Sequence, residues 1–183
     1  MLTVNVTGHR QIVPAGEMGS PWPDSNRNVA AHHKLVMGRI AEILSHWHKE
    51  NDLTCCISGM ALGADTIFAE AVMHVKSLGW PVRLIAAVPF TGQESRWNAR
   101  SQQKFHAILA AADEVKVVSE GGYTPAKMQI RNEWMVNNAH FTLAVWDGRR
   151  KGGTWNCIRY ALKQGKTVWQ LHPQTLECGI LEI

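Results

Sequence analysis

The sequence predicts an α/β protein with a Rossmann-like three-layer sandwich, in which helices cover both faces of a mostly parallel six-stranded sheet. Short β-branched runs alternate with segments whose apolar residues recur at helical spacing. Gly-rich or polar turns separate these segments. A chain of 183 residues, 45% of them hydrophobic and 19% charged, has apolar material for one core. We therefore expect residues 1–183 to form a single domain.

The expected strands are short apolar runs bounded by turn residues. They lie at 3–7, 53–57, 82–88, 114–118, 141–146 and 167–171. The strand at 3–7 is β-branched and ends at Gly8, which predicts a central strand followed by a tight turn. The run at 167–171 is expected to be the last strand.

The expected helices show one apolar face and recognisable ends. They lie at 28–51, 65–78, 95–112, 129–138 and 154–164. Asn26 or Asn28 can cap the first helix and Ser95 the third, while Gly79 and Gly165 can terminate the second and the last.

One long segment interrupts the alternation. Residues 11–27 contain three prolines and two glycines, so they cannot form a regular helix. Because ligands of open parallel sheets bind beside the carboxyl ends of the strands, this loop is either a flap over a site or a surface excursion.

Composition and charge exclude several classes of protein. No apolar run approaches the roughly 20 residues of a membrane-spanning helix, and the first residues lack the basic region of a secretory signal, so we expect a cytoplasmic protein. Four cysteines with no Cys-x-x-Cys spacing predict neither a disulfide framework nor a metal site. A net charge of +4 suits a small anionic ligand better than nucleic acid.

The first two strands end in glycine turns. Gly8 precedes His9 and Arg10, which can both donate to an anion, although a solvated arginine beside a turn is the simpler alternative. The second turn, residues 58–65, leads into a helix, whose N-terminus favours phosphate. It matches neither the dinucleotide fingerprint nor the P-loop, so a nicotinamide dehydrogenase or P-loop ATPase loses its main support. The site residues expected in this turn are Ser58, Gly59, Gly63, Ala64 and Asp65.

Asp65 is either a helix cap or a ribose-binding or catalytic carboxylate. After the third strand, Phe90 and Gln93 have the ring and the amide that contact purines, whereas a packing role is the alternative. Tyr123 is a further aromatic candidate. Farther on, Arg131 is preferred over Glu133 as a site residue, because side chains two apart on a helix point to different sides.

The fifth strand ends at Asp147, a candidate for ribose binding or catalysis. The basic residues 149–151 follow, and then Gly152, Gly153 and Thr154 begin a helix. Two glycine-rich helix starts at separate strand ends indicate a phosphate site more strongly than either start alone.

Together these motifs resemble the YpsA-like branch of the SLOG superfamily, over almost the whole chain. The resemblance rests on residues 6–10, 57–65, 88–90 with Gln93 and Trp97, Arg131 with Asn132, and 145–148 with 152–154. The superfamily includes the Lonely Guy phosphoribohydrolases, the DNA-processing protein A family and sensor domains for ligands related to ADP-ribose. The resemblance implies a nucleotide or nucleotide sugar held between the 59–65 and 152–154 turns.

The sequence departs from the Lonely Guy pattern at one catalytic position. The glutamate that helps those enzymes cleave an N-glycosidic bond lies three residues after the threonine of their motif, where this chain has Cys157. A thiol cannot replace a carboxylate beside an oxocarbenium-like transition state. Cytokinin-type phosphoribohydrolase activity is therefore not expected.

Three functions remain open at this point. The leading one is a binder or sensor of a small nucleotide-derived ligand, without metal or cofactor, in which Asp65 and Asp147 bind ribose hydroxyls, Arg10 and Arg131 bind phosphate, and Phe90 and Tyr123 flank the base. The second is a nucleotide N-glycosidase using Asp65, Glu133 or Asp147. Single-stranded DNA binding ranks last. Because relatives with this fold commonly self-associate, a homo-oligomer also remains open.

Overall fold

The computed structural model describes residues 2–13 and 26–182, apart from the side chains of 26–28. The strands are β1 (Leu2–Gly8), β2 (Leu53–Ser58), β3 (Arg83–Val88), β4 (Glu114–Val117), β5 (Phe141–Val145), β6 (Thr167–Leu171) and β7 (Cys178–Ile180). The helices are α1 (Asn26–Asn51), α2 (Ala64–Ser77), α3 (Ala99–Ala111), α4 (Pro125–Asn137) and α5 (Gly152–Lys163).

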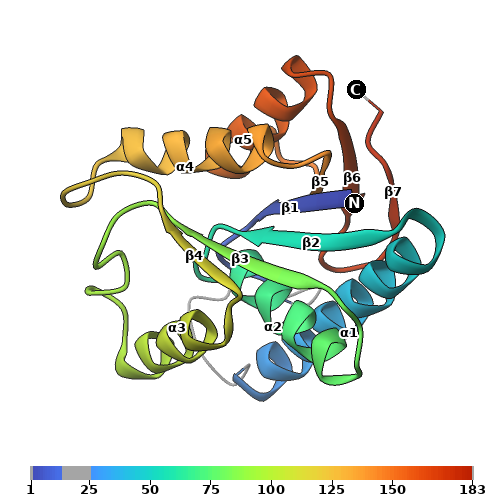
Figure 1. The fold of residues 1–183 in the computed structure, drawn as a ribbon, viewed down its shortest axis with the longest axis horizontal. Helices are drawn as coiled ribbons and strands as arrows, with labels where there is room; N and C mark the ends of the chain where they lie inside the picture. Colours follow the sequence, from blue (N-terminus) through green and yellow to red (C-terminus); the bar gives the residue numbers. More distant parts are fainter. Residues whose placement is uncertain (1, 14–25, 183) are drawn as a thin grey trace.

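All described strands belong to one sheet with the order β4-β3-β2-β1-β5-β6-β7. Every neighbouring pair is parallel except β6 with β7. Figure 1 shows α4 and α5 on one face of the sheet and α1, α2 and α3 on the other. The predicted α/β fold with a mostly parallel sheet and helices on both faces is therefore confirmed.

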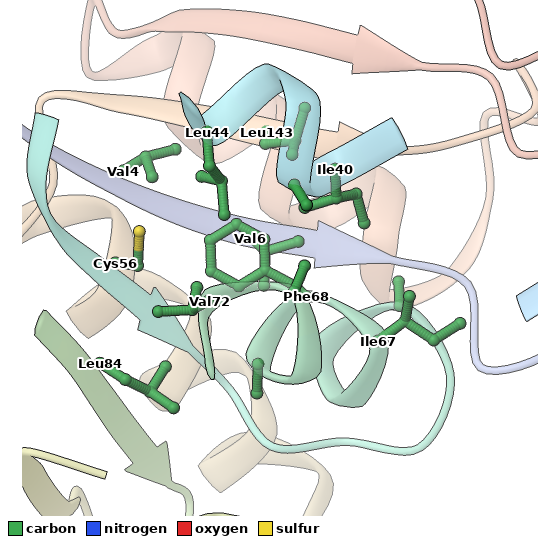
Figure 2. Packing of buried hydrophobic residues seen from close by; sticks show 14 of the residues in the cluster. Val4, Val6, Ile40, Leu44, Cys56, Ile67, Phe68, Val72, Leu84 and Leu143 are labelled. Atoms are coloured by element: carbon green, nitrogen blue, oxygen red, sulfur yellow. The ribbon is translucent and has the colours of Figure 1, made fainter. Parts of the chain in front are cut away.

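The main core lies between the sheet and the layer formed by α1 and α2. Val6 on β1 and Phe68 on α2 are completely buried, and Figure 2 shows them packed together with Ile40 and Leu44 of α1. Burying a side chain of this size contributes about 1.5–3 kcal/mol. This packing against α1 and α2 holds in place the strands that carry the candidate site.

The expectation that residues 167–171 form the last strand is wrong. After β6, the backbone turns through Leu176, whose φ is 61°, and β7 pairs antiparallel with β6, so that the sheet has seven strands. A strand of three residues is too short to show an alternating pattern in the sequence.

Two helix starts also differ from expectation. The third helix is capped by Asn98, whose Oδ1 accepts the Ser101 amide at 2.9 Å, and not by Ser95, because turns occupy residues 91–96. The fourth begins at Pro125 with Thr124 as its cap, earlier than the predicted 129. The loop at 11–27, expected to be either a flap or a surface excursion, and the side chains of Asn26 and Asn28 lie largely outside the described residues.

The strand order reverses direction between β1 and β5. The chain adds β2, β3 and β4 on one side of β1 and then places β5 on its other side. Gly8 of β1 lies opposite Val145 of β5, so that the segments after these two residues leave the same edge of the sheet side by side. Ligands of open α/β sheets bind at such a switch point.

Candidate functional site

Two groups of charged side chains lie at the carboxyl edge of the sheet. We call Gly59, Asp65 and Arg131 the arginine cluster, because the Arg131 guanidinium joins the end of β2 to α2. We call His9, Asp147 and Arg149 the histidine cluster, because His9 joins the end of β1 to the end of β5. The Ala64 amide donates to the His9 carbonyl at 3.0 Å and links the two clusters.

The arginine cluster is buried and charged. Arg131 comes from α4 and is 5% exposed, and its Nη1 donates to the Gly59 carbonyl and to Oδ2 of Asp65 at 3.2 Å. A side chain at Gly59 would occupy the position of Nη1, so this close approach requires glycine there. Burial raises the pKa of the Asp65 carboxyl, although Arg131 and the Ala61 amide act in the opposite direction.

Arg131 has unused hydrogen-bonding capacity. Its Nε is buried and has no partner, and within the described residues its hydrogen bonds come from Nη1 alone. A guanidinium has five donors, and a buried donor without a partner is destabilising by about 1–3 kcal/mol. The Arg131 guanidinium can therefore donate hydrogen bonds to an additional acceptor group.

The turn between β2 and α2 is held by its own contacts. Ser58 Oγ donates to the Asp65 carbonyl at 2.8 Å, and Gln93 Nε2 donates to the Met60 carbonyl at 2.7 Å. Gly63 lies so close to the carbonyls of His9 and Arg10 that an added Cβ would be 2.4 Å from each oxygen. These carbonyls face the start of α2, so this turn is less open to an anion than its glycines suggest.

The histidine cluster lies at the switch point. His9 Nε2 is 2.8 Å from Asp147 Oδ1, and Arg149 Nε donates to Asp147 Oδ2 at 2.6 Å. Burial opposes ionisation of Asp147, but hydrogen bonds from the Arg149 side chain and backbone and from His9 outweigh it and hold the pKa of this carboxyl below its usual range. Asp147 is therefore a carboxylate at neutral pH.

This pKa shift predicts how stability depends on pH. Because the folded pKa lies below the unfolded value of 3.8, ionised Asp147 stabilises the fold above that value and this contribution is lost as pH falls further. We expect Asp147→Asn to flatten the acid limb of a plot of unfolding free energy against pH, measured by urea titration from pH 6 to pH 2.5.

The exposed Glu120 supplies the control, and Glu120→Gln should follow the wild type across this range. Parallel loss of stability in wild type and Asp147→Asn on acidification would contradict the assignment.

The N-terminus of α5 is open. Its cap residue Lys151 makes no side-chain capping bond, Gly152 and Gly153 are exposed, and the predicted site residue Thr154 is 9% exposed. The first-turn amides of a helix attract anions when no side chain caps them. One turn into α5, burial raises the pKa of the Cys157 thiol to about 11, so Cys157 is an uncharged thiol and no nucleophile at neutral pH.

The aromatic candidates contact each other. Phe90 is 5% exposed and Tyr123 is 61% exposed, and their rings meet edge to face with centroids 6.0 Å apart. A base has no room between rings in this geometry, so stacking on a base would use the exposed face of Tyr123. The amide nitrogen of Gln93 is already bonded to Met60, which leaves its oxygen for a base edge.

The remaining candidates lie around these clusters. Arg10 is exposed and close enough to affect the ionisation of Asp65. Glu133 on α4 accepts a hydrogen bond from Gln129 at 2.9 Å. Asn132 follows Arg131 on α4 and is 8% exposed.

An open groove of about 670 Å³ lies between α4 and α5, and it was not predicted from the sequence. We call it the α4–α5 groove; its walls include Gln129, Asn132, Gly153, Asn156 and Arg159. Residues 153, 156, 160 and 163 all line it, at the spacing of one helical face. This recurrence along α5 is the sequence pattern that could have predicted the groove.

The described residues contain no group of three or more His, Cys, Asp and Glu side chains that could hold a metal ion. Among the helices that the structure describes, none has the length and hydropathy to cross a bilayer. All four cysteines are free.

Comparison with known proteins places these features in a family. The YpsA model, described as the YspA SLOG family, matches residues 5–176. The uncharacterized SPbeta prophage-derived protein YoqJ of Bacillus subtilis is 37% identical over 130 residues, which are 64% of this chain and 75% of that protein. The UPF0398 protein BH1768 of Halalkalibacterium halodurans is 33% identical over 109 residues, 59% of this chain and 57% of that protein.

Solved structures agree on the fold. DNA processing protein A of Helicobacter pylori, reported for its single-stranded DNA binding mode, superposes with a TM-score of 0.57 at 18% identity, covering 93% of this chain and 65% of that one. The Streptococcus pneumoniae protein gives a TM-score of 0.54 at 17% identity, covering 92% of this chain and 50% of that one. With a family model that matches nearly every described element, the chain belongs to the YpsA family of SLOG proteins.

Proposed function

We propose that the chain binds a small nucleotide-derived ligand, such as a nucleotide, a nucleotide sugar or an ADP-ribose-like molecule, at the carboxyl edge of the sheet, as a sensor or binding protein. The observation that carries this proposal is the buried Arg131 guanidinium, whose Nε has no partner among residues 2–13 and 26–182. A buried cation with unused donors suits a phosphate or a ligand carbonyl, because such a group would satisfy them.

The open N-terminus of α5 supplies the second element of the proposed site. Arg131 is close enough to the first turns of α5 to affect the ionisation of Cys157, and Asn132, next to it on α4, lines the same groove as Gly153. Amides of Gly153 and Thr154 would hold a phosphate there, in line with the helix dipole. Asp147 and His9, at the switch point, would bind ribose hydroxyls.

A charge placed at Gly153 tests the phosphate position. Gly153 has open space around it and no positive φ, so a side chain fits. We expect Gly153→Asp to raise the free energy of unfolding by roughly 0.5–1 kcal/mol, because an acid favours a helix N-terminus, and to weaken binding of a phosphate-bearing ligand at least tenfold by repulsion.

The matched control is Gly153→Asn, which adds almost the same volume without charge. Thermal shift against AMP, ADP, ADP-ribose, NAD, cyclic dinucleotides and guanine analogues measures both effects, since a ligand at about 100 times its Kd adds about 2.7 kcal/mol. If the Asp and Asn variants bind the ligand with equal affinity, the phosphate does not lie at the N-terminus of α5. If no compound shifts the thermal unfolding of the wild type, the proposed function is wrong.

The same mixtures separate a binder from an N-glycosidase. Chromatography after incubation should recover the ligand intact if the protein is a sensor. Free base and ribose phosphate would instead assign hydrolysis to Asp65, Glu133 or Asp147, each of which is already engaged by a partner in this structure.

Single-stranded DNA is the second candidate, and it ranks higher than charge alone suggested. The chain is similar in fold to a DNA processing protein reported to bind single-stranded DNA. Exposed cations also line α5 and its entry, namely Arg150, Lys151, Arg159 and Lys163. Steep loss of oligonucleotide binding with added salt would favour it, and no binding at low salt would exclude it.

A further inference from the structure

We propose that the α4–α5 groove is a second subsite, which takes the distal nucleoside of a dinucleotide-type ligand whose phosphate lies at the N-terminus of α5. This inference rests on the proposed function and deepens it, because it narrows the ligand to one with two nucleosides. The volume of about 670 Å³ falls within the roughly 300–1,000 Å³ typical of small-molecule sites.

Asn132 is the main indication that a ligand belongs in the groove. It is 8% exposed, lines the groove, and its amide has no hydrogen-bond partner within the described residues. Neither polar atom of this amide is among the fully buried atoms that lack a partner, so the amide reaches the groove and offers both donors and an acceptor there. That combination matches the edge of a nucleobase.

The groove is continuous with the proposed phosphate position. Gly153 belongs both to the first turn of α5 and to the groove wall, so a phosphate at that turn lies at the groove entrance. From Gly153 to Lys163, which also lines the groove, α5 rises about 15 Å. A group attached beyond the phosphate is needed to occupy that length, because a mononucleotide directed toward the strand ends leaves the groove empty.

The chemistry of the walls also fits a nucleoside with an anionic linkage. Arg159 and Lys163 line the groove, and no carboxylate is among its lining residues. Trp155 forms part of the wall and is held rigidly, stacked on Trp146 with centroids 5.5 Å apart. Rigid aromatic walls with amide and cationic groups suit a planar heterocycle on a phosphate.

A contact between the two helices favours a ligand of limited length. Tyr160 Oη donates to Asn137 Oδ1 at 3.1 Å and joins α5 to the last residue of α4. A continuous nucleic-acid strand would have to pass this contact, whereas a dinucleotide would not.

Isothermal titration with NAD, which has two nucleosides, and AMP, which has one, tests the inference. We expect the wild type to bind NAD at least ten times more tightly than AMP. Asn156→Trp, which fills the groove, and Arg159→Glu, which reverses a wall charge, should each abolish this preference while leaving AMP affinity unchanged. Arg100→Glu makes the same charge change on α3, on the other face of the sheet, and should alter neither affinity.

Equal affinity of the wild type for AMP and NAD would overturn the subsite while leaving the proposed function intact. A preference that survives both groove variants would overturn it too. Binding of neither compound, together with no thermal shift from any other nucleotide of the series, would instead defeat the proposed function itself. A thymidine oligonucleotide that binds tightly and is lost in Asn156→Trp, with NAD no better than AMP, would overturn the dinucleotide in favour of single-stranded DNA.

Discussion

Gly63→Ala is expected to lower the free energy of unfolding by about 3 kcal/mol or more. Gly63 has φ 86° and ψ −125°, a conformation that residues with a side chain avoid. The added Cβ would also lie 2.4 Å from the carbonyl oxygens of His9 and Arg10. These contacts are with backbone, which cannot rotate away, so strain and overpacking of about 1–3 kcal/mol each add together.

Gly38→Ala is the matched control, because Gly38 lies within α1 and a Cβ there meets no atom within 4 Å. It should stabilise the protein by roughly 0.5–1 kcal/mol, since glycine is a poor helix former. Urea unfolding of both variants beside the wild type measures the difference. A Gly63→Ala variant within 0.5 kcal/mol of the wild type would show that the β1 and β2 exits do not approach as described.

Arg131→Met is expected to destabilise the protein by about 3–5 kcal/mol at neutral pH, because it leaves Asp65 buried with its counter-charge removed. Burial already raises the pKa of Asp65, and loss of Arg131 would raise it further. A raised folded pKa penalises the fold as pH rises above the unfolded value of 3.8, so the deficit of the variant should shrink as pH falls toward 4.

Adding Asp65→Asn to Arg131→Met removes the stranded carboxylate. The double variant should be less destabilised than the sum of the two single variants, and its deficit should depend less on pH. Arg100→Met on α3 controls for the loss of an exposed arginine. Additive effects of the two single changes would contradict a coupled buried pair.

The fold was largely predictable because each central element has a strong local signal. Val4 and Asn5 of β1, which point to opposite faces of the sheet, are both completely buried, as expected for a central strand with helices on both faces. The start of α4 could have been predicted, because Thr124 followed by Pro125 is a typical helix start. The seventh strand could not have been predicted, since three residues become a strand only through pairing with β6.

The site was predictable as a location and only in part as a set of contacts. Parallel strands bring their carboxyl ends to one edge, so the meeting of the 8–10, 58–65 and 147–154 segments followed from the sheet. The pairing of His9 with Asp147 and of Arg131 with Gly59 joins residues 138 and 72 positions apart. Such contacts depend on side-chain reach across the sheet edge, which no local pattern encodes.

The order of the strands also bears on how the protein acquires its site during folding. β1 pairs with β2 across about 50 residues but with β5 across about 137, as the partners Val4 and Phe141 illustrate. Distant pairings form late, because closing a longer loop has a larger entropic penalty. A chain that has folded only through β4 would hold the ends of β1 to β4 and no histidine cluster. Binding of the proposed ligand should therefore report completion of the β1–β5 seam and stabilise only the fully folded protein.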